Sequence, residues 1–359
     1  MNRSKSERLH SHGTAGLFAA TLLAAATAAV AGENERSVLV LTSTNNPASN
    51  AVVVFKLETA STPLLTYLDT VTTGGKGGAS GNAGVLQFKD DRGAVANFGS
   101  NSVTKLIRQG DSISIGSTIN QAPGCTQPDS VALTKDHLFI VGANCAESRA
   151  WPSGAPDGAV VPLTDPSAAQ IAVGKHWSAV TLKSGSVLQL LLTREGALNG
   201  ASAAIMLPST ADNTPLGEAF WGDLLGFTPA HSPDSFAIVN KDQTVVPITG
   251  PTPPYPTNAP CWVAKGAGNV WYTGNSPGQA VSIFFSDGDG GVFYKSIPLP
   301  GAPTDVTVSH DGRWLAVIYS ASGDARVAVF SIDSYGDLTP AGTSSTVGVT
   351  AFSGVAISE

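Results

Sequence analysis

The chain has 359 residues, a formal net charge of −7 and only 13% charged residues. With no cluster of Lys and Arg, this acidic balance argues against a nucleic-acid partner. The 39 Gly and 23 Pro residues, together with frequent Val, favour an all-β chain of short strands and tight turns.

Residues 1–31 are predicted to be a secretory signal peptide. Three basic residues lie near the start, an Ala-rich apolar run covers residues 15–30, and Ala29-Val30-Ala31 gives the small-x-small cleavage pattern. A membrane anchor is the alternative for this run, but the run is short and interrupted by Thr. We therefore expect a periplasmic or secreted protein with no membrane span after signal removal, and a single domain over residues 32–359.

After residue 36, a unit of short apolar strands and tight turns recurs at a period of roughly 45 residues. The clearest copy starts at Pro303, turns at His310-Asp311-Gly312-Arg313, continues through the strand at residues 326–332 and ends with a strand from Leu338. This spacing is typical of the four-stranded blades of a β-propeller.

Weaker copies indicate further blades, and the two ends of the repeat region indicate how the ring closes. The copies open at Asn82, Pro128, His176-Trp177, Phe220-Trp221 and Pro260. The block from Ser37 enters at the second strand of the unit, whereas residues 352–358 have the opening-strand pattern with nothing after it. The sequence therefore predicts a seven-bladed β-propeller whose first blade is closed by the C-terminal strand, which removes exposed sheet edges.

Two of the three cysteines can be placed by hairpin arithmetic. Cys125 precedes one predicted strand and Cys145 follows the next, so the two positions are symmetric about the turn at Lys135. They should face each other across the hairpin, and an oxidising compartment favours a disulfide between them. Cys261 is then left single.

Several segments resemble the exported bacterial branch of the lactonase-family seven-bladed β-propellers. Their better-known relatives are the propeller-type 6-phosphogluconolactonases and the fungal carboxymuconate cyclases. The resemblance covers essentially the whole mature chain and rests on residues 41–55, Thr73-Gly-Gly-Lys-Gly-Gly78, residues 97–103, Ala259-Pro-Cys-Trp-Val263 and Ser309-His-Asp-Gly-Arg313.

The resemblance implies a propeller that hydrolyses a small lactone, or forms one by cyclisation, at its central channel. An exported acidic chain without an Arg/Lys group for phosphate favours a non-phosphorylated lactone or hydroxy acid. A non-catalytic periplasmic propeller that binds a protein or a small molecule is the alternative, because propellers host many unrelated functions. We expect a monomer.

The candidate site residues come from aligning the predicted inner-strand openings. The alignment superposes His176-Trp177, Phe220-Trp221 and Cys261-Trp262 with Asp129 and Asp305, which predicts one shared rim at the channel. His176, Asp129 and Asp305 are the candidate catalytic residues, with His176 as the base that activates water. The candidate substrate-binding residues are Trp177, Trp221, Asp223, Cys261 and Trp262.

Each of these assignments has a structural alternative. The tryptophans could pack between blades, and His176 could be an ordinary structural residue. Cys261 could instead be a thiol nucleophile paired with His176, although a single buried thiol beside Trp is usually inert. The sequence has no serine-hydrolase elbow and no zinc-binding motif, so we predict no metal site, and it identifies no cofactor.

Overall fold

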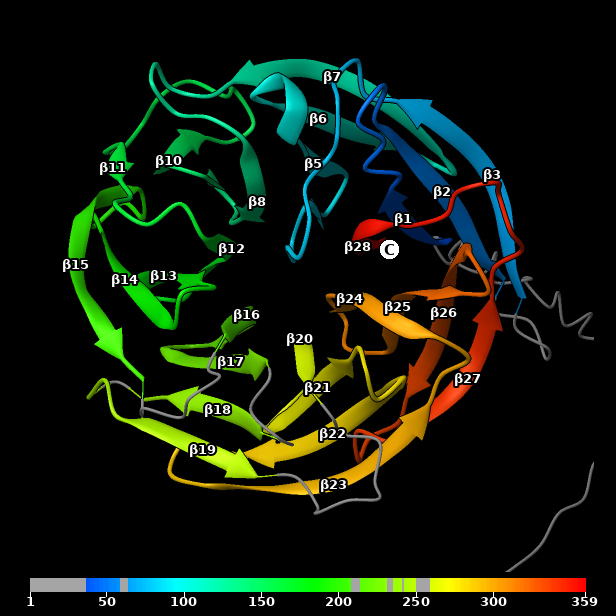
Figure 1. The fold of residues 1–359 in the computed structure, drawn as a ribbon. Coiled ribbons are helices and arrows are strands. Elements are labelled where there is room, and N and C mark those ends of the chain that lie inside the picture. The colour runs from blue at the N-terminus through cyan, green and yellow to red at the C-terminus, as the bar shows by residue number, and fades with distance from the viewer. Residues whose placement is uncertain (1–36, 59–63, 208–213, 231–234, 241, 250–258) are drawn as a thin grey trace, which may run out of the picture. The chain divides into compact units, whose positions relative to one another are not determined.

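The computed structural model describes residues 37–58, 64–207, 214–230, 235–240, 242–249 and 259–359, so the predicted signal peptide lies outside the described residues. Residues Arg36–Glu359 form one compact unit. Its described residues form 28 strands in seven four-stranded antiparallel sheets, arranged as a ring of blades (Figure 1). The predicted all-β, seven-bladed β-propeller is confirmed.

Each blade runs from an inner strand at the channel to an outer strand at the rim. In that order, blade 1 comprises β28 (Ser353–Ser358), β1 (Val38–Ser43), β2 (Ala51–Glu58) and β3 (Leu64–Thr72), and blade 2 comprises β4 (Leu86–Lys89), β5 (Arg92–Asn97), β6 (Ser102–Gln109) and β7 (Ser112–Asn120), with a 3-10 turn η1 (Phe98–Ser100). Blade 3 comprises β8 (Pro128–Leu133), β9 (His137–Gly142), β10 (Cys145–Ala150) and β11 (Val161–Pro162), and blade 4 comprises β12 (Ala168–Val173), β13 (Trp177–Leu182), β14 (Ser186–Leu192) and β15 (Leu198–Met206). Blade 5 comprises β16 (Thr214–Trp221), β17 (Leu224–Ala230), β18 (Ser235–Val239) and β19 (Val245–Thr249). Blade 6 comprises β20 (Pro260–Lys265), β21 (Val270–Asn275), β22 (Ala280–Ser286) and β23 (Gly291–Pro298), and blade 7 comprises β24 (Ala302–Val308), β25 (Trp314–Ala321), β26 (Asp324–Ile332) and β27 (Leu338–Thr343).

The predicted closure of the ring is confirmed. The C-terminal strand β28 pairs antiparallel with β1, with Val40 opposite Ile357, and lies at the inner position of blade 1. The Thr42 hydroxyl also donates a 2.8 Å hydrogen bond to the Gly354 carbonyl oxygen. The first blade is therefore built from both ends of the described chain, and its inner edge is covered.

Two of the predicted blade openings are wrong. Inner strands do begin at or next to Pro128, Pro260 and Pro303, but His176-Trp177 stands before the second strand of blade 4, and Phe220-Trp221 ends the inner strand of blade 5. The true inner strands β12 and β16 start several residues earlier. Both aromatic pairs mark a turn between strands one and two of a blade, where a bulky residue packs against the next blade.

The core lies between neighbouring blades, where apolar faces of adjacent sheets meet. In one cluster, Phe236 from β18 packs on Trp271 from β21, with ring centroids 5.2 Å apart, and also on Phe284 from β22. Alternating side chains of the strands supply these faces. Such packing fixes each inner strand from both sides and holds its channel-facing residues in place.

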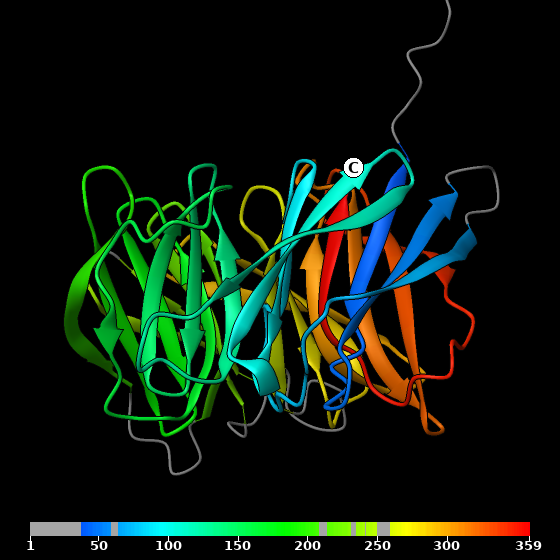
Figure 2. The same ribbon diagram turned by 90° about the horizontal axis from the view of Figure 1, so that it is seen from above.

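All seven inner strands run in the same direction along the channel. The residues that end β4, β8, β24 and β28, namely Lys89, Leu133, Val308 and Ser358, gather around one cavity. We call this the open end and the opposite end, where inner strands begin, the closed end; Figure 2 shows the strands running between the two faces. Within the described ranges, no helix has the length and apolar character needed to cross a membrane.

Candidate functional site

Two adjoining cavities occupy the channel. The inner cavity, of about 220 Å³, is lined by residues from all seven inner strands, and the outer cavity, of about 300 Å³, lies at the open end. Gln87, Leu133, Thr307 and Val308 line both cavities, so the two lie next to each other along the channel. A volume of this order suits a small ring rather than a polymer.

The closed end is blocked by residues Asn82–Gly84, which we call the cross-channel segment. The Ala83 N–H donates to the Ala169 carbonyl of blade 4 at 3.3 Å, and the Gly84 N–H donates to Asp305 Oδ2 of blade 7 at 3.3 Å. Blades 4 and 7 lie on opposite sides of the ring, so the segment must cross the channel. Gly84 also lines the inner cavity, so the segment forms part of its wall at this end.

Asp305, on inner strand β24, is a buried carboxyl on the wall of the inner cavity. Its Oδ1 accepts the Val306 N–H at 2.8 Å and its Oδ2 accepts the Gly84 N–H at 3.3 Å. Burial raises the pKa of Asp305 to about 7, and these amides together with that of Val355 oppose the rise only in part. A carboxyl with this pKa can accept and return a proton near neutral pH.

Glu218, on inner strand β16, is a second buried carboxyl lining the same cavity, and the sequence reasoning missed it. Its backbone N–H donates to Gln170 Oε1 at 2.8 Å, and its carboxyl oxygens are fully buried beside the backbone amides of Ala172 and Thr181. Burial raises the pKa of Glu218 well above its usual range. The signal that could have revealed it is an acidic residue inside an otherwise weakly polar strand.

Lys265 is the basic residue among those lining the inner cavity. Its ammonium donates to the carbonyl oxygens of Gly266 and Gly268, both at 2.6 Å, and lies 4.8 Å from the ring centroid of Trp221. Burial lowers the pKa of Lys265 to about 8. Trp221 therefore lies at the open end, where its partly exposed ring packs over the Lys265 ammonium.

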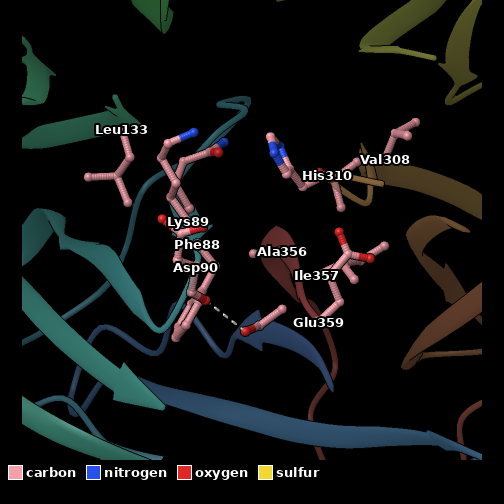
Figure 3. Close-up of a pocket in the computed structure, with 12 residues that line it drawn as sticks. Phe88, Lys89, Asp90, Leu133, Val308, His310, Ala356, Ile357 and Glu359 are labelled. Carbon is pink, nitrogen blue, oxygen red and sulfur yellow. Dashed lines mark hydrogen bonds between the residues drawn. The ribbon is translucent and has the colours of Figure 1, made fainter. Parts of the chain in front are cut away.

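The outer cavity brings together ionisable side chains from three parts of the chain. Figure 3 shows Lys89 at the end of β4 and His310 from the turn after β24 on opposite sides of the cavity, with Glu359 nearby. Glu359 Oε1 accepts the Asp311 N–H at 2.7 Å, and the Ser358 hydroxyl donates to the Asp90 carbonyl oxygen at 3.1 Å. The mouth of the channel is thus polar and of mixed charge.

The structure places His176 away from both cavities. Its side chain is 67% exposed, and Nδ1 lies 2.7 Å from Asp223 Oδ2 in the β16–β17 turn. The indole of Trp177 donates to the Asp223 carbonyl at 3.3 Å and packs edge-on against Phe220, with centroids 4.7 Å apart. These residues tie blades 4 and 5 together on the face of the open end, and Trp177 is interblade packing.

The other candidates lie at the closed end. Asp129 accepts a hydrogen bond from Asn82 of the cross-channel segment, and burial raises its pKa to about 6 although Asn82 and Lys183 oppose the rise. Trp262 is buried and its indole donates to the Pro303 carbonyl at 2.9 Å. Burial raises the pKa of the Cys261 thiol, which disfavours the nucleophilic thiolate. The predicted single rim is therefore wrong, because its members are divided between the two ends of the channel.

The disulfide between Cys125 and Cys145 is present as predicted, with a Cα–Cα distance of 5.6 Å, and Cys261 is free and buried. Among the residues that the structure describes, no group of three or more His, Cys, Asp or Glu side chains is arranged to hold a metal ion. The residues with polar side chains that line the inner cavity are Asp305, Glu218, Gln87, Gln170, Thr307 and Lys265.

Comparison with known proteins supports the fold. No protein-family model matches the sequence, and no curated protein matches it. Solved structures with a similar fold include a protein from Lactobacillus plantarum (TM-score 0.66, 15% identity, 90% of this chain and 100% of that chain) and a candidate 6-phosphogluconolactonase from Bacteroides uniformis (0.63, 14%, 86% and 99%). A periplasmic gluconolactonase from Pseudomonas aeruginosa is also similar (0.64, 14%, 90% and 99%). At these identities the likeness shows the fold, and the resemblance to lactonase-type propellers is confirmed at that level.

Proposed function

We propose that this chain is an exported propeller that hydrolyses a small non-phosphorylated lactone, or forms one by the reverse reaction, in its inner cavity. The observation that carries the proposal is Asp305, a buried carboxyl with a pKa of about 7 on the wall of a small polar cavity. The lactonase names of two structural neighbours support the same reaction class.

In the hydrolytic direction Asp305 acts as the base. Its carboxylate takes a proton from water as the water oxygen bonds to the lactone carbonyl carbon. The ring C–O bond then breaks, and Asp305 returns the proton to the departing ring oxygen, which leaves a hydroxy acid. Cyclisation is the same sequence reversed, so the geometry serves either direction.

The preference for an unphosphorylated ring rests on charge. Lys265 is the cation among the described residues lining the inner cavity, and its ammonium is already directed at two backbone carbonyl oxygens. A phosphate needs a cluster of Arg and Lys donors, and that wall does not supply one. Export is supported by the disulfide, which persists in oxidising compartments, and by the N-terminal apolar run.

A binding protein without catalysis is the second candidate. It is favoured by one observation: both oxygens of Asp305 already accept backbone N–H groups, so the carboxyl also serves to fix the cross-channel segment. His176 as the catalytic base remains a separate hypothesis, although that side chain lies outside the cavities.

A lactone panel tests the proposal. Glucono-δ-lactone and simple γ- and δ-lactones are followed by acid release with a pH indicator, after subtraction of the uncatalysed rate. We expect turnover by the wild type and by Asp69→Asn, an exposed acid on β3 that serves as the control, and loss in Asp305→Asn. Saturable binding of the lactones without turnover would support the binding protein instead.

A further inference from the structure

Three polar side chains line the outer cavity at the open end without a partner of their own. Gln87 and Lys89 lie on β4, and His310 lies in the turn after β24. Within the described ranges, none of the three side chains forms a hydrogen bond or an ion pair. Figure 3 shows Lys89 and His310 on opposite sides of the cavity. A ligand between them would therefore meet hydrogen-bond donors from both sides.

The carboxyls that share this cavity do not neutralise its donors. Glu359 Oε1 accepts the Asp311 N–H at 2.7 Å, and Oε2 is buried, so this carboxyl is turned into the wall. Burial and the neighbouring Asp311 carboxyl raise the pKa of Glu359, while Asp311 itself is paired with Arg313. Asp90 is exposed at the end of β4 and, among the described residues, forms no ion pair with Lys89.

The reaction proposed above changes the charge of the ligand. A lactone is neutral, whereas the hydroxy acid on the other side of the reaction carries a carboxylate at neutral pH. The inner cavity suits that anion poorly, because Asp305 and Glu218 lie on its wall and the Lys265 ammonium is bonded to two backbone carbonyl oxygens. The adjoining outer cavity, with Lys89 and His310 as donors, suits it better.

We propose that the outer cavity binds the carboxylate of a small hydroxy acid, with the Lys89 ammonium and the His310 imidazole as its donors from opposite sides. The proposal rests on the proposed function and adds the place of the anionic form, whichever way the reaction runs. No covalent bond is made or broken. Gln87 lines both cavities, so its amide can bond a hydroxyl group of the same molecule where the cavities meet.

Calorimetric titration with two matched ligands tests the site. Gluconate is the probe, and gluconamide, in which an amide replaces the carboxylate, is the neutral control ligand. We expect the wild type to bind gluconate about tenfold more tightly than gluconamide, because charge-assisted hydrogen bonds are stronger than neutral ones. In Lys89→Gln and in His310→Gln this preference should fall to about threefold or less. Thermal melting checks that both variants fold.

Lys175→Gln is the matched control variant. Lys175 is exposed in the turn after β12, on the face of the open end, and lines neither cavity. Its replacement removes the same charge as Lys89→Gln, so the preference for gluconate should stay at the wild-type value. A wild type without this preference, a preference kept in Lys89→Gln or in His310→Gln, or an equal loss in Lys175→Gln would overturn the proposal.

Histidine NMR signals supply a second measurement that needs no turnover. The imidazole signal that is missing from His310→Gln should shift when gluconate is added to the wild type, and should stay in place with gluconamide. The signal that is missing from His176→Gln is the control, because that side chain is exposed on the same face but lies outside both cavities. Equal shifts of the two signals would contradict binding between Lys89 and His310.

The two proposals fail separately. If lactones are hydrolysed but gluconate binds no better than gluconamide, the carboxylate site is refuted while the lactonase function stands. If gluconate binding depends on Lys89 and His310 but no lactone is turned over, the carboxylate site stands and the enzymatic function is refuted.

Discussion

Asp305 and Glu218 occupy the same position on inner strands β24 and β16, and backbone N–H groups face both carboxyls: those of Val306, Gly84 and Val355 at Asp305, and those of Ala172 and Thr181 at Glu218. The amides lower the cost of ionising Asp305, whereas Glu218 keeps most of the penalty of burial. One fold position repeated around the ring therefore gives two buried carboxyls whose pKa values are both raised by burial.

The stability of the protein should fall as the pH rises through the range in which Asp305 ionises. The unfolded chain ionises this group near 3.8 and the folded chain at about 7, so the folded state binds the extra proton between these values. This difference corresponds to about 4 kcal/mol of stability, present below about pH 4 and lost above about pH 7.

Urea unfolding at a series of pH values measures this dependence. Asp129 and Glu218 act in the same direction, so the wild-type slope contains all three groups. Asp305→Asn should be less stable at low pH, because its amide meets backbone donors, but its stability should fall less steeply between about pH 4 and pH 7. Identical slopes in wild type and variant would contradict the raised pKa.

The choice between Asp305 and His176 as the base can be made by activity against pH. If Asp305 is the base, the rate of lactone hydrolysis should fall below about pH 7, and His176→Ala should keep at least half of the wild-type kcat/KM because that side chain is exposed and outside the cavity. Loss of activity in a folded His176→Ala protein would return the role to the His176–Asp223 pair.

More of the architecture than of the candidate site could be predicted from the sequence. Ring closure could be predicted because an unpaired strand pattern stood at each end, and the disulfide because two cysteines were symmetric about one turn. The prediction of a single rim was wrong because His176-Trp177 and Phe220-Trp221 resemble the start of an inner strand. In the structure they flank the turn that follows the inner strand. Glu218 was missed because the burial of its carboxyl between blades follows from tertiary packing, which a single acidic residue in the sequence does not reveal.

The cross-channel segment depends on glycine at position 84. Gly84 has φ +63°, and an added Cβ would lie 2.9 Å from Ser130 Oγ. Gly84→Ala should therefore cost about 1–2 kcal/mol of stability for the left-handed backbone. It should also displace the segment and weaken the hydrogen bond from the residue 84 N–H to Asp305. Gly110 is the matched control, since its φ is also +63° and nothing lies within 4 Å of an added Cβ.

Chemical unfolding and lactone turnover of the two glycine variants separate strain from crowding. Gly110→Ala should lose only the stability that corresponds to the left-handed backbone penalty, and it should keep its activity. Gly84→Ala should lose more stability and activity as well. Equal behaviour of the two variants would mean that the segment adjusts freely and does not position Asp305.

Removal of the closing strand should expose a sheet edge. Deletion of residues 350–359 eliminates β28, which pairs with β1 and supplies the Val355 amide to Asp305. The truncated chain should aggregate or unfold, because β1 would present unpaired backbone groups. A chain starting at residue 36 retains every described strand and should remain soluble. Size-exclusion chromatography compares the two, and equal solubility would show that the ring does not need this strand.

The disulfide should contribute to stability and account for two of the three thiols. Cys125 and Cys145 are 20 positions apart, and closing a loop of this size stabilises a fold by about 3 kcal/mol. Denatured protein should react with one equivalent of a thiol reagent before reduction and three after it, because Cys261 is free. Cys261→Ala provides the control: it should show no thiol before reduction and two after. Non-reducing peptide maps should link Cys125 to Cys145, and any bridge to Cys261 would contradict the β8–β9 hairpin, which brings the residues before β8 close to the start of β10 in blade 3.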